Sequence, residues 1–195
     1  MTYRNAVTYV HALLQHIVQP GDVVVDATVG NGYDTSVLAE LVGPTGTVYG
    51  FDIQAEAIAS TRARLSDLSN RVEMFHAGHE ELITYLPSSV HGSIRAVTFN
   101  LGYLPGGDKS CTTTTATTCA AVTQAMQILA PGGTITVVCY PHPEGQAEYR
   151  ALLEMLRTVP QDNFVCSDVS FVNHPTASAR VLCITRHASA GNHLP

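Results

Sequence analysis

Short apolar runs rich in β-branched residues recur along most of this chain. Seven of them cover residues 22–26, 46–52, 72–76, 94–100, 134–140, 164–170 and 180–186. Their nearly continuous apolar character is typical of strands that are buried on both faces of a parallel sheet. We therefore expect a sheet of seven strands at the centre of the fold.

The segments between these runs carry apolar residues three or four positions apart, which predicts helices. They cover residues 3–19, 33–42, 55–68, 79–86, 112–130 and 145–158. Strands that alternate with helices predict an α/β, Rossmann-like fold, with right-handed crossovers and helices on both faces of a mostly parallel sheet. A loop containing Asn173 and Pro175 joins the last two strands, so we expect a terminal hairpin and a C-terminal antiparallel strand.

The length of 195 residues fits one domain that spans residues 1–195. Its leading helix, residues 3–19, is amphipathic, and we expect the small and polar tail after about residue 187 to be disordered. No apolar window reaches the ~18 residues of a transmembrane helix. The N-terminus also lacks the pattern of a secretory signal, so we expect a cytoplasmic protein.

The net charge is -6, and Lys109 is the only lysine. This balance argues against broad, non-specific nucleic-acid binding, which depends on neutralising many phosphates. It leaves open an RNA substrate that is held by a few arginines. The five cysteines include no CxxC pair, so we expect neither a disulfide framework nor a metal site.

The segment DATVGNGYDT at residues 26–35 follows the first strand and leads into a helix. Gly30 and Gly32 allow the backbone to approach a ligand closely, and the helix N-terminus offers free N–H groups. Without further support, the same glycines fit an ordinary tight turn equally well. Thr35 stands where a dinucleotide fingerprint has its third glycine, so a pyrophosphate site is disfavoured.

Polar residues also follow the later strands. Asp52 ends the second strand, where an acid can accept hydrogen bonds from both ribose hydroxyls of an adenosine. Gly78 and His79 follow the third strand, where an adenine would lie, although His79 fits a helix cap equally well. Asn100 ends the fourth strand, and a reacting group is expected there because ligands bind beyond the carboxyl ends of strands.

In these segments the chain resembles the class I methyltransferases. It is most similar to a bacterial family first described as rRNA methylases and now understood as tRNA 5-aminomethyl-2-thiouridine methyltransferases. The resemblance covers about residues 6–186 and rests on DATVGNGYDT, on FDIQ at 51–54 and on NLGYLPGGDK at 100–109. A weaker part is YPHPEG at 140–145 with Glu148. There Pro141 stands before His142 where the family has glycine, which changes the backbone of that loop.

The resemblance implies an enzyme that uses S-adenosylmethionine and no metal. The residues that it places at the cofactor are Asp26, Gly30, Asn31, Gly32, Asp52, Gln54, Gly78, His79, Asn100 and Leu101. It places Asn100, Tyr103 and His142 at the methyl acceptor, with Tyr140 across the pocket. Amphipathic aromatic residues such as Tyr103 more often pack than catalyse. His142 or Asp108 is a candidate proton acceptor, although Asp108 also fits a helix cap.

The acceptor that the resemblance implies is the primary amine of 5-aminomethyl-2-thiouridine at the wobble position, in the anticodon region of tRNA. A homodimer could build the RNA cradle that one small acidic domain lacks. Methylation of rRNA or of a small amine remains an alternative, and so does a non-catalytic module that binds the cofactor or RNA. A nicotinamide-dependent dehydrogenase is disfavoured by the missing third glycine, and the fold alone does not choose among these chemistries.

Overall fold

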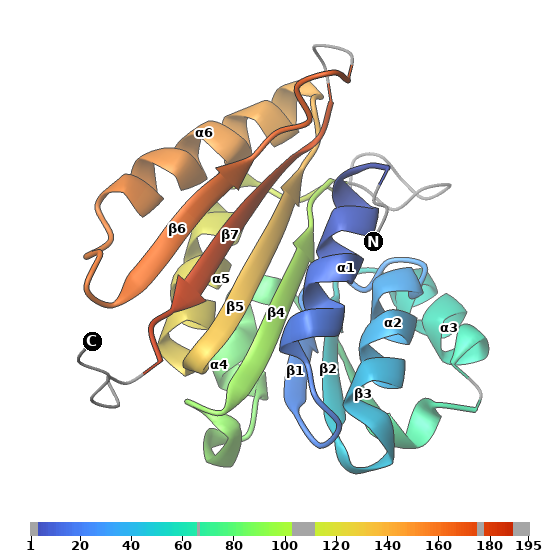
Figure 1. The fold of residues 1–195 in the computed structure, drawn as a ribbon. Helices are drawn as coiled ribbons and strands as arrows, with labels where there is room; N and C mark the ends of the chain where they lie inside the picture. Colours follow the sequence, from blue (N-terminus) through green and yellow to red (C-terminus); the bar gives the residue numbers. More distant parts are fainter. Residues whose placement is uncertain (1–3, 66, 103–111, 175–177, 189–195) are drawn as a thin grey trace.

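A computed structural model describes residues 4–65, 67–102, 112–174 and 178–188. Within them, seven strands form one sheet in the order β3-β2-β1-β4-β5-β7-β6 (Figure 1). The strands are β1 Val23–Asp26, β2 Thr47–Asp52, β3 Val72–His76, β4 Ile94–Asn100, β5 Leu129–Cys139, β6 Phe164–Val169 and β7 Arg180–Arg186. All pairs from β3 to β5 are parallel, and β7 runs antiparallel to both β5 and β6. The predicted mostly parallel sheet and its antiparallel C-terminal strand are confirmed.

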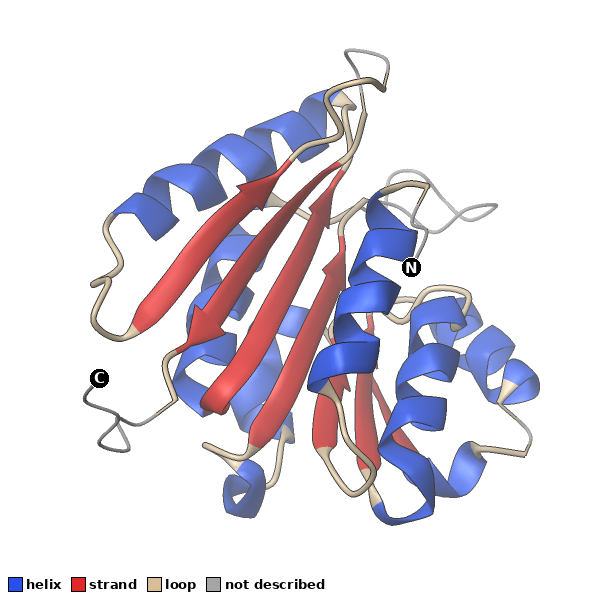
Figure 2. Ribbon diagram, in the orientation of Figure 1, coloured by secondary structure: helices blue, strands red, loops and turns tan. Residues whose placement is uncertain are grey.

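Helices cover both faces of the sheet (Figure 2). They are α1 Ala6–Ile17, α2 Tyr33–Val42, α3 Ala55–Arg64, α4 Leu82–Tyr85, α5 Thr115–Ile128 and α6 Pro143–Arg157. One apolar core lies between the sheet and helices α1 and α2. A second core lies between the opposite face and helices α4, α5 and α6. Two cores of this kind are what an α/β sheet needs to remove both of its faces from water.

The position of β1 marks a reversal in the order of the strands. Its neighbours are β2 on one side and β4 on the other. The helices α2 and α5, which come after β1 and β4 in the chain, cover opposite faces of the sheet. Ligands of open α/β sheets bind at such a reversal.

Several helices are shorter than their apolar periodicity indicates. The expected helix 3–19 begins at Ala6, because Asn5 and Thr8 form a capping box. The expected helix 55–68 ends at Arg64. The expected helix 79–86 is a 3-10 turn followed by the single turn of α4. These corrections move element boundaries but not the order of the elements.

The largest correction concerns the segment between α5 and β5. Helix α5 begins at Thr115, after a second capping box at Thr114, and it ends at Ile128. The expected helix continued to residue 130 and the expected strand began at 134, but β5 already begins at Leu129. Leu129 pairs with Ile94 of β4, and the register shifts before the regular pairing begins. Pairing with β4 therefore overrides the helical periodicity of these residues.

The two edge strands are less buried than we expected. Residues 165–168 of β6 are exposed, and β3 alternates between half-buried and exposed positions. An edge strand has only one neighbouring strand and is only partly covered by helices, so its outer positions reach water. The expectation that all strands are buried on both faces is therefore wrong for β3 and β6. Among the described residues, no helix has the length and apolar character required to cross a membrane.

Candidate active site

Polar residues from three central strands meet at the carboxyl edge of the sheet. Strands β1, β2 and β4 end at Asp26, Asp52 and Asn100. The three strands are parallel neighbours, so these residues lie along one edge. His79 follows β3 in a 3-10 turn, and His142 follows β5 as the N-cap of α6. The structure therefore brings the described residues of the predicted site to the same end of the molecule.

The loop after β1 is held in a shape that only glycine tolerates. Gly30 has φ 53° and Gly32, the N-cap of α2, has φ 77°. The Thr61 hydroxyl donates to the Gly30 carbonyl at 3.0 Å and so ties the loop to α3. A Cβ on Gly32 would lie 2.6 Å from that hydroxyl oxygen. The loop thus lies against α3 with no room for a side chain at position 32.

We expect Gly32→Ala to destabilise the fold by about 2 kcal/mol, because it adds backbone strain and a clash with Thr61. Gly92→Ala is the matched control, since Gly92 has φ 81° but nothing within 4 Å of an added Cβ. Urea unfolding of both variants separates the clash from the strain alone. Equal losses of stability would contradict the tight packing of the loop.

The Asp52 carboxylate closes this loop. Its Oδ2 accepts a hydrogen bond from the Gly30 N–H at 2.8 Å, and its Oδ1 accepts one from the Gln54 N–H at 2.9 Å. A carboxylate offers about four acceptor positions, so each oxygen keeps capacity for a further donor. The next side chain, Ile53, is 54% exposed although it is apolar. A ligand with a flat apolar group beside a pair of hydroxyls would fit here, with the apolar group on Ile53 and the hydroxyls on Asp52.

Asp26 is buried beneath the loop. Its Oδ2 accepts a hydrogen bond from the Thr35 hydroxyl at 2.6 Å, and its Oδ1 accepts one from the Thr28 N–H at 3.2 Å. Burial and the nearby charge of Asp34 raise the pKa of Asp26 to about 7, against these hydrogen bonds. The charge of Asp52 raises it further. The acidic groups of Asp26 and Asp52 therefore interact, and a cationic ligand beside them would favour the ionised form of Asp26.

The His79 ring is buried beside the same loop. It is 7% exposed, and it packs edge-on against Phe99 with ring centroids 5.7 Å apart. Burial lowers its pKa, so the ring is neutral at physiological pH. Among the described residues its Nε2 has no hydrogen-bond partner. A buried polar atom without a partner is a candidate ligand contact.

Asn100, the last residue of β4, connects this strand to the loop after β1. Its backbone N–H donates to the Thr28 hydroxyl at 2.7 Å, and its side-chain Nδ2 donates to the Asp34 carboxylate at 3.1 Å. Burial and the charge of Asp34 raise the pKa of Tyr140, while a hydrogen bond with Asn100 lowers it. Asn100 thus lies between the cofactor-type loop and the residues after β5.

His142 is fixed by the start of α6. Its Nδ1 accepts a hydrogen bond from the Gly145 N–H at 3.1 Å, which places the proton of the neutral ring on Nε2. Nδ1 also lies 3.2 Å from a carboxylate oxygen of Glu144, and a hydrogen bond between them requires the proton to be on Nδ1 instead. A Cβ on Gly102 would lie 3.4 Å from Nε2. The neutral ring therefore presents a donor toward the segment after β4.

Three predicted residues differ from the rest. The Leu101 side chain is 2% exposed and packs in the core, so only its main chain is available to a ligand. Tyr103 and Asp108 lie outside the described residues, as does most of the tail after residue 187. Sequence reasoning assigned no role to His11, Asp34 or Ile53. Asp34 lies inside the DATVGNGYDT motif, which was the available signal, but nothing in the sequence links it to His11.

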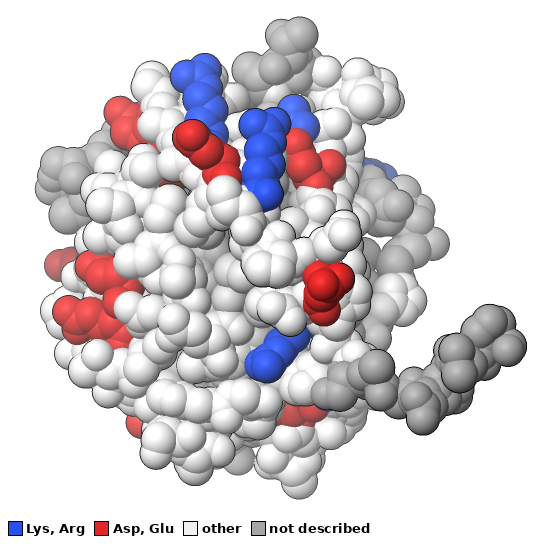
Figure 3. All heavy atoms as spheres, turned by 90° about the vertical axis from the view of Figure 1, so that its left-hand side faces the viewer, with Lys and Arg blue, Asp and Glu red and all other residues white. Residues whose placement is uncertain are grey.

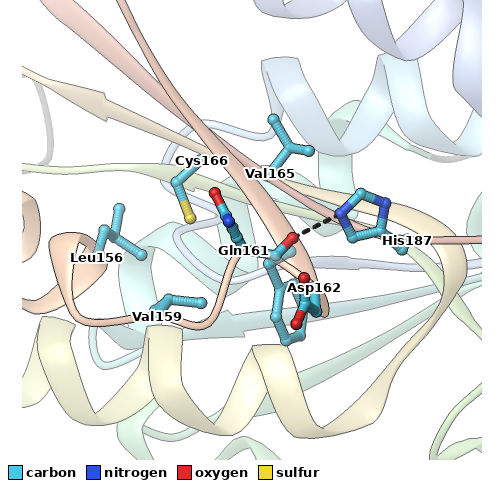
Figure 4. Close-up of a pocket in the computed structure, with 8 residues that line it drawn as sticks. Leu156, Val159, Gln161, Asp162, Val165, Cys166 and His187 are labelled. Carbon is cyan, nitrogen blue, oxygen red and sulfur yellow. Dashed lines mark hydrogen bonds between the residues drawn. The ribbon is translucent and has the colours of Figure 1, made fainter.

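A hollow of about 690 Å³ lies elsewhere, between the end of α6 and the start of β6 (Figure 4). Apolar side chains line part of it, and His187 Nε2 lies 2.8 Å from the Gln161 carbonyl at its rim. Strand β6 runs parallel to β5, so the start of β6 faces away from the carboxyl edge. We therefore assign the hollow no role in the candidate site.

Comparison with known proteins identifies relatives along most of the chain. A family model described as "Putative rRNA methylase" matches residues 48–185. The chloroplastic tRNA (mnm(5)s(2)U34)-methyltransferase of Arabidopsis thaliana is 36% identical, over 94% of this chain and 70% of its own length. This relative covers the candidate site and both halves of the sheet.

Solved structures agree in fold. A crystal structure described as a "putative rRNA-methylase" from Clostridium thermocellum is 41% identical, with a TM-score of 0.89, and the match covers 95% of this chain and all of that one. A methyltransferase from Streptococcus mutans, solved in complex with SAH, is 29% identical with a TM-score of 0.83. That match covers 95% of this chain and 99% of the other.

Proposed function

Since this chain belongs to the rRNA methylase family of S-adenosylmethionine-dependent methyltransferases, we propose that it methylates the primary amine of 5-aminomethyl-2-thiouridine at the tRNA wobble position. The observation that carries the proposal is the 36% identity to a tRNA (mnm(5)s(2)U34)-methyltransferase along 94% of the chain. The reversal of strand order between β1 and β4 supports it, because ligands of α/β sheets bind at such a position.

The described residues fit S-adenosylmethionine as the cofactor. We place its ribose hydroxyls on Asp52 and its adenine between Ile53 and His79, whose buried Nε2 has no partner among the described residues. The backbone of Gly30 to Gly32 gives the close approach that its methionine end requires. Bound adenosylmethionine supplies a methyl group on a cationic sulfur, which an amine can attack. Asp52, together with Asp26 in its ionised form, favours that positive charge.

We place the acceptor amine beside Asn100, between the loop after β1 and the residues after β5. Only a neutral amine has the lone pair that forms the new N–C bond, so the site must accept the amine with its nitrogen aligned and deprotonated. The Asn100 side-chain oxygen can orient an N–H of the amine. Holding the two reactants in line contributes much of the acceleration in reactions of this kind. Tyr103 and His142 remain our candidates for shaping this pocket.

The surface of this protein that binds tRNA is also part of the proposal. Figure 3 shows the side of the molecule that carries α6 and β6, where most of the surface is uncharged and the basic groups lie next to acidic ones. Arg180, for example, donates to Asp168 at 2.6 Å. The described residues on this side therefore offer no continuous basic stripe to a phosphate backbone. We propose that the anticodon region approaches from the carboxyl edge, and that a second subunit completes the cradle.

A methyl-transfer assay tests the proposed function. Purified protein and labelled S-adenosylmethionine are incubated with tRNA from cells that lack this gene, and the nucleosides are identified by mass spectrometry. We expect 5-aminomethyl-2-thiouridine to be converted to its N-methyl form, and tRNA that already carries this methyl group is the control. Cofactor binding without transfer to tRNA, together with transfer to rRNA or a small amine, would contradict the proposal.

A further inference from the structure

We propose that Asp34 and His11 form a positioning pair that fixes the amide of Asn100, so that its oxygen faces the methyl acceptor. The inference rests on the proposed function, because it gives Asn100 the task of orienting the acceptor amine. It adds two residues that carry no part of the cofactor or acceptor assignments made above. Neither residue needs to touch the acceptor.

Three separate elements bring His11, Asp34 and Asn100 together. His11 comes from the middle of α1, Asp34 from the first turn of α2 and Asn100 from the last position of β4. His11 Nε2 lies 2.6 Å from Asp34 Oδ1, and Asn100 Nδ2 donates to Asp34 Oδ2 at 3.1 Å. The side chains of His11 and Asp34 are only 22% and 13% exposed. Each oxygen of the carboxylate therefore serves one partner in a largely water-excluded place.

This arrangement decides which way the Asn100 amide is turned. An ionised carboxylate accepts hydrogen bonds and donates none, so the amide group that faces Asp34 is the NH₂. With its NH₂ bound to Asp34 Oδ2, Asn100 directs its oxygen away from that carboxylate.

His11 fixes the carboxylate in the same way. Because Asp34 only accepts, the His11 nitrogen that faces it carries a proton. Without His11, the carboxylate could turn about its side-chain bond and release Asn100. The amide could then flip, since its oxygen and its NH₂ have almost the same shape. A flipped amide would present a donor to the acceptor amine, which still needs a partner for its own N–H.

The kinetic test compares Asp34→Ala and His11→Ala with wild type. The control is His16→Ala, which removes an exposed histidine from the same helix. We expect kcat for tRNA methylation to fall about tenfold in both test variants, less than the roughly hundredfold that a reactant misplaced by about 1 Å can cost. The Kd for S-adenosylmethionine and the KM for tRNA should stay within about threefold of wild type. Asp34→Asn keeps one acceptor oxygen and should recover part of the lost kcat.

Three results would overturn the inference. A loss of cofactor affinity equal to the loss of kcat would place Asp34 at the cofactor, and unchanged kcat in His11→Ala would leave the pair without a role. Neutron crystal structures of wild type and His11→Ala distinguish the amide oxygen from the NH₂ and give a readout that needs no RNA. We expect the Asn100 amide to be turned in the variant, and an unmoved amide would overturn the inference. If wild type leaves tRNA unmethylated, the proposed function fails, while this structural comparison still decides the positioning role.

Discussion

Asp52→Ala is expected to weaken S-adenosylmethionine binding about a hundredfold, which corresponds to about 2.7 kcal/mol. The Asp52 carboxylate already receives the N–H groups of Gly30 and Gln54, and its remaining acceptor positions suit two ribose hydroxyls. Hydrogen bonds to a charged group are worth about 1.5–3 kcal/mol each. The variant loses these bonds and also the clamp on the Gly30 loop. Calorimetric titration with S-adenosylmethionine measures the change.

Two further variants make this result specific. Glu56→Ala is the control, because Glu56 is an exposed acid one turn along the chain in α3 and we expect its removal to leave the affinity unchanged. Asp52→Asn keeps one acceptor oxygen and should lie between wild type and Asp52→Ala. Thermal unfolding without cofactor reports damage to the loop separately. Wild-type affinity in Asp52→Ala would contradict the ribose assignment.

The order of the elements could be predicted because each strand carries its own apolar signal. Strands β4 and β7 and helix α2 begin and end where the sequence pattern places them. Prediction failed where two signals compete, as at Leu129 and Ala130, whose apolar side chains continue the helical pattern of α5. Pairing with β4 decides that competition, and the sequence does not reveal which strand will lie alongside. Helix ends failed for a similar reason, since a cap such as Asn5 or Thr114 stops a pattern that would otherwise continue.

The site was predictable as far as its residues lie in local motifs. Asp26 and Asp52 are the last residues of their strands, and the glycine loop comes shortly after Asp26. The topology alone therefore brings these residues to one edge. The contact between His11 and Asp34 could not be predicted, because 23 residues separate them and the packing of α1 over the sheet joins them. The unusual exposure of Ile53 is likewise a property of the folded surface. Sequence reasoning therefore found the cofactor loop better than the neighbours that orient it.

The acidic cluster also links stability to pH. The pKa of Asp26 is raised from its ordinary value of 3.8 to about 7 in the folded chain. Burial is the largest cause, and the charge of Asp34 is the second. A group with a raised folded pKa stabilises the fold fully below its unfolded pKa. That contribution falls as the pH rises from about 4 and is lost once the pH passes about 7. Ionised Asp26 therefore costs the folded state free energy at neutral and higher pH.

Asp26→Asn should remove this pH dependence, because asparagine has nearly the shape of the protonated acid and does not ionise. Between pH 4.5 and pH 8, we expect the free energy of unfolding of wild type to fall by a few kcal/mol relative to Asp26→Asn, from the difference between about 7 and 3.8. Urea unfolding at pH 4.5, 6 and 8 measures the two curves. Glu40→Gln, an exposed acid on α2, should run parallel to wild type. Parallel curves for Asp26→Asn and wild type would show that Asp26 is already ionised at low pH, and that the cluster meets its cofactor with all of its negative charge in place.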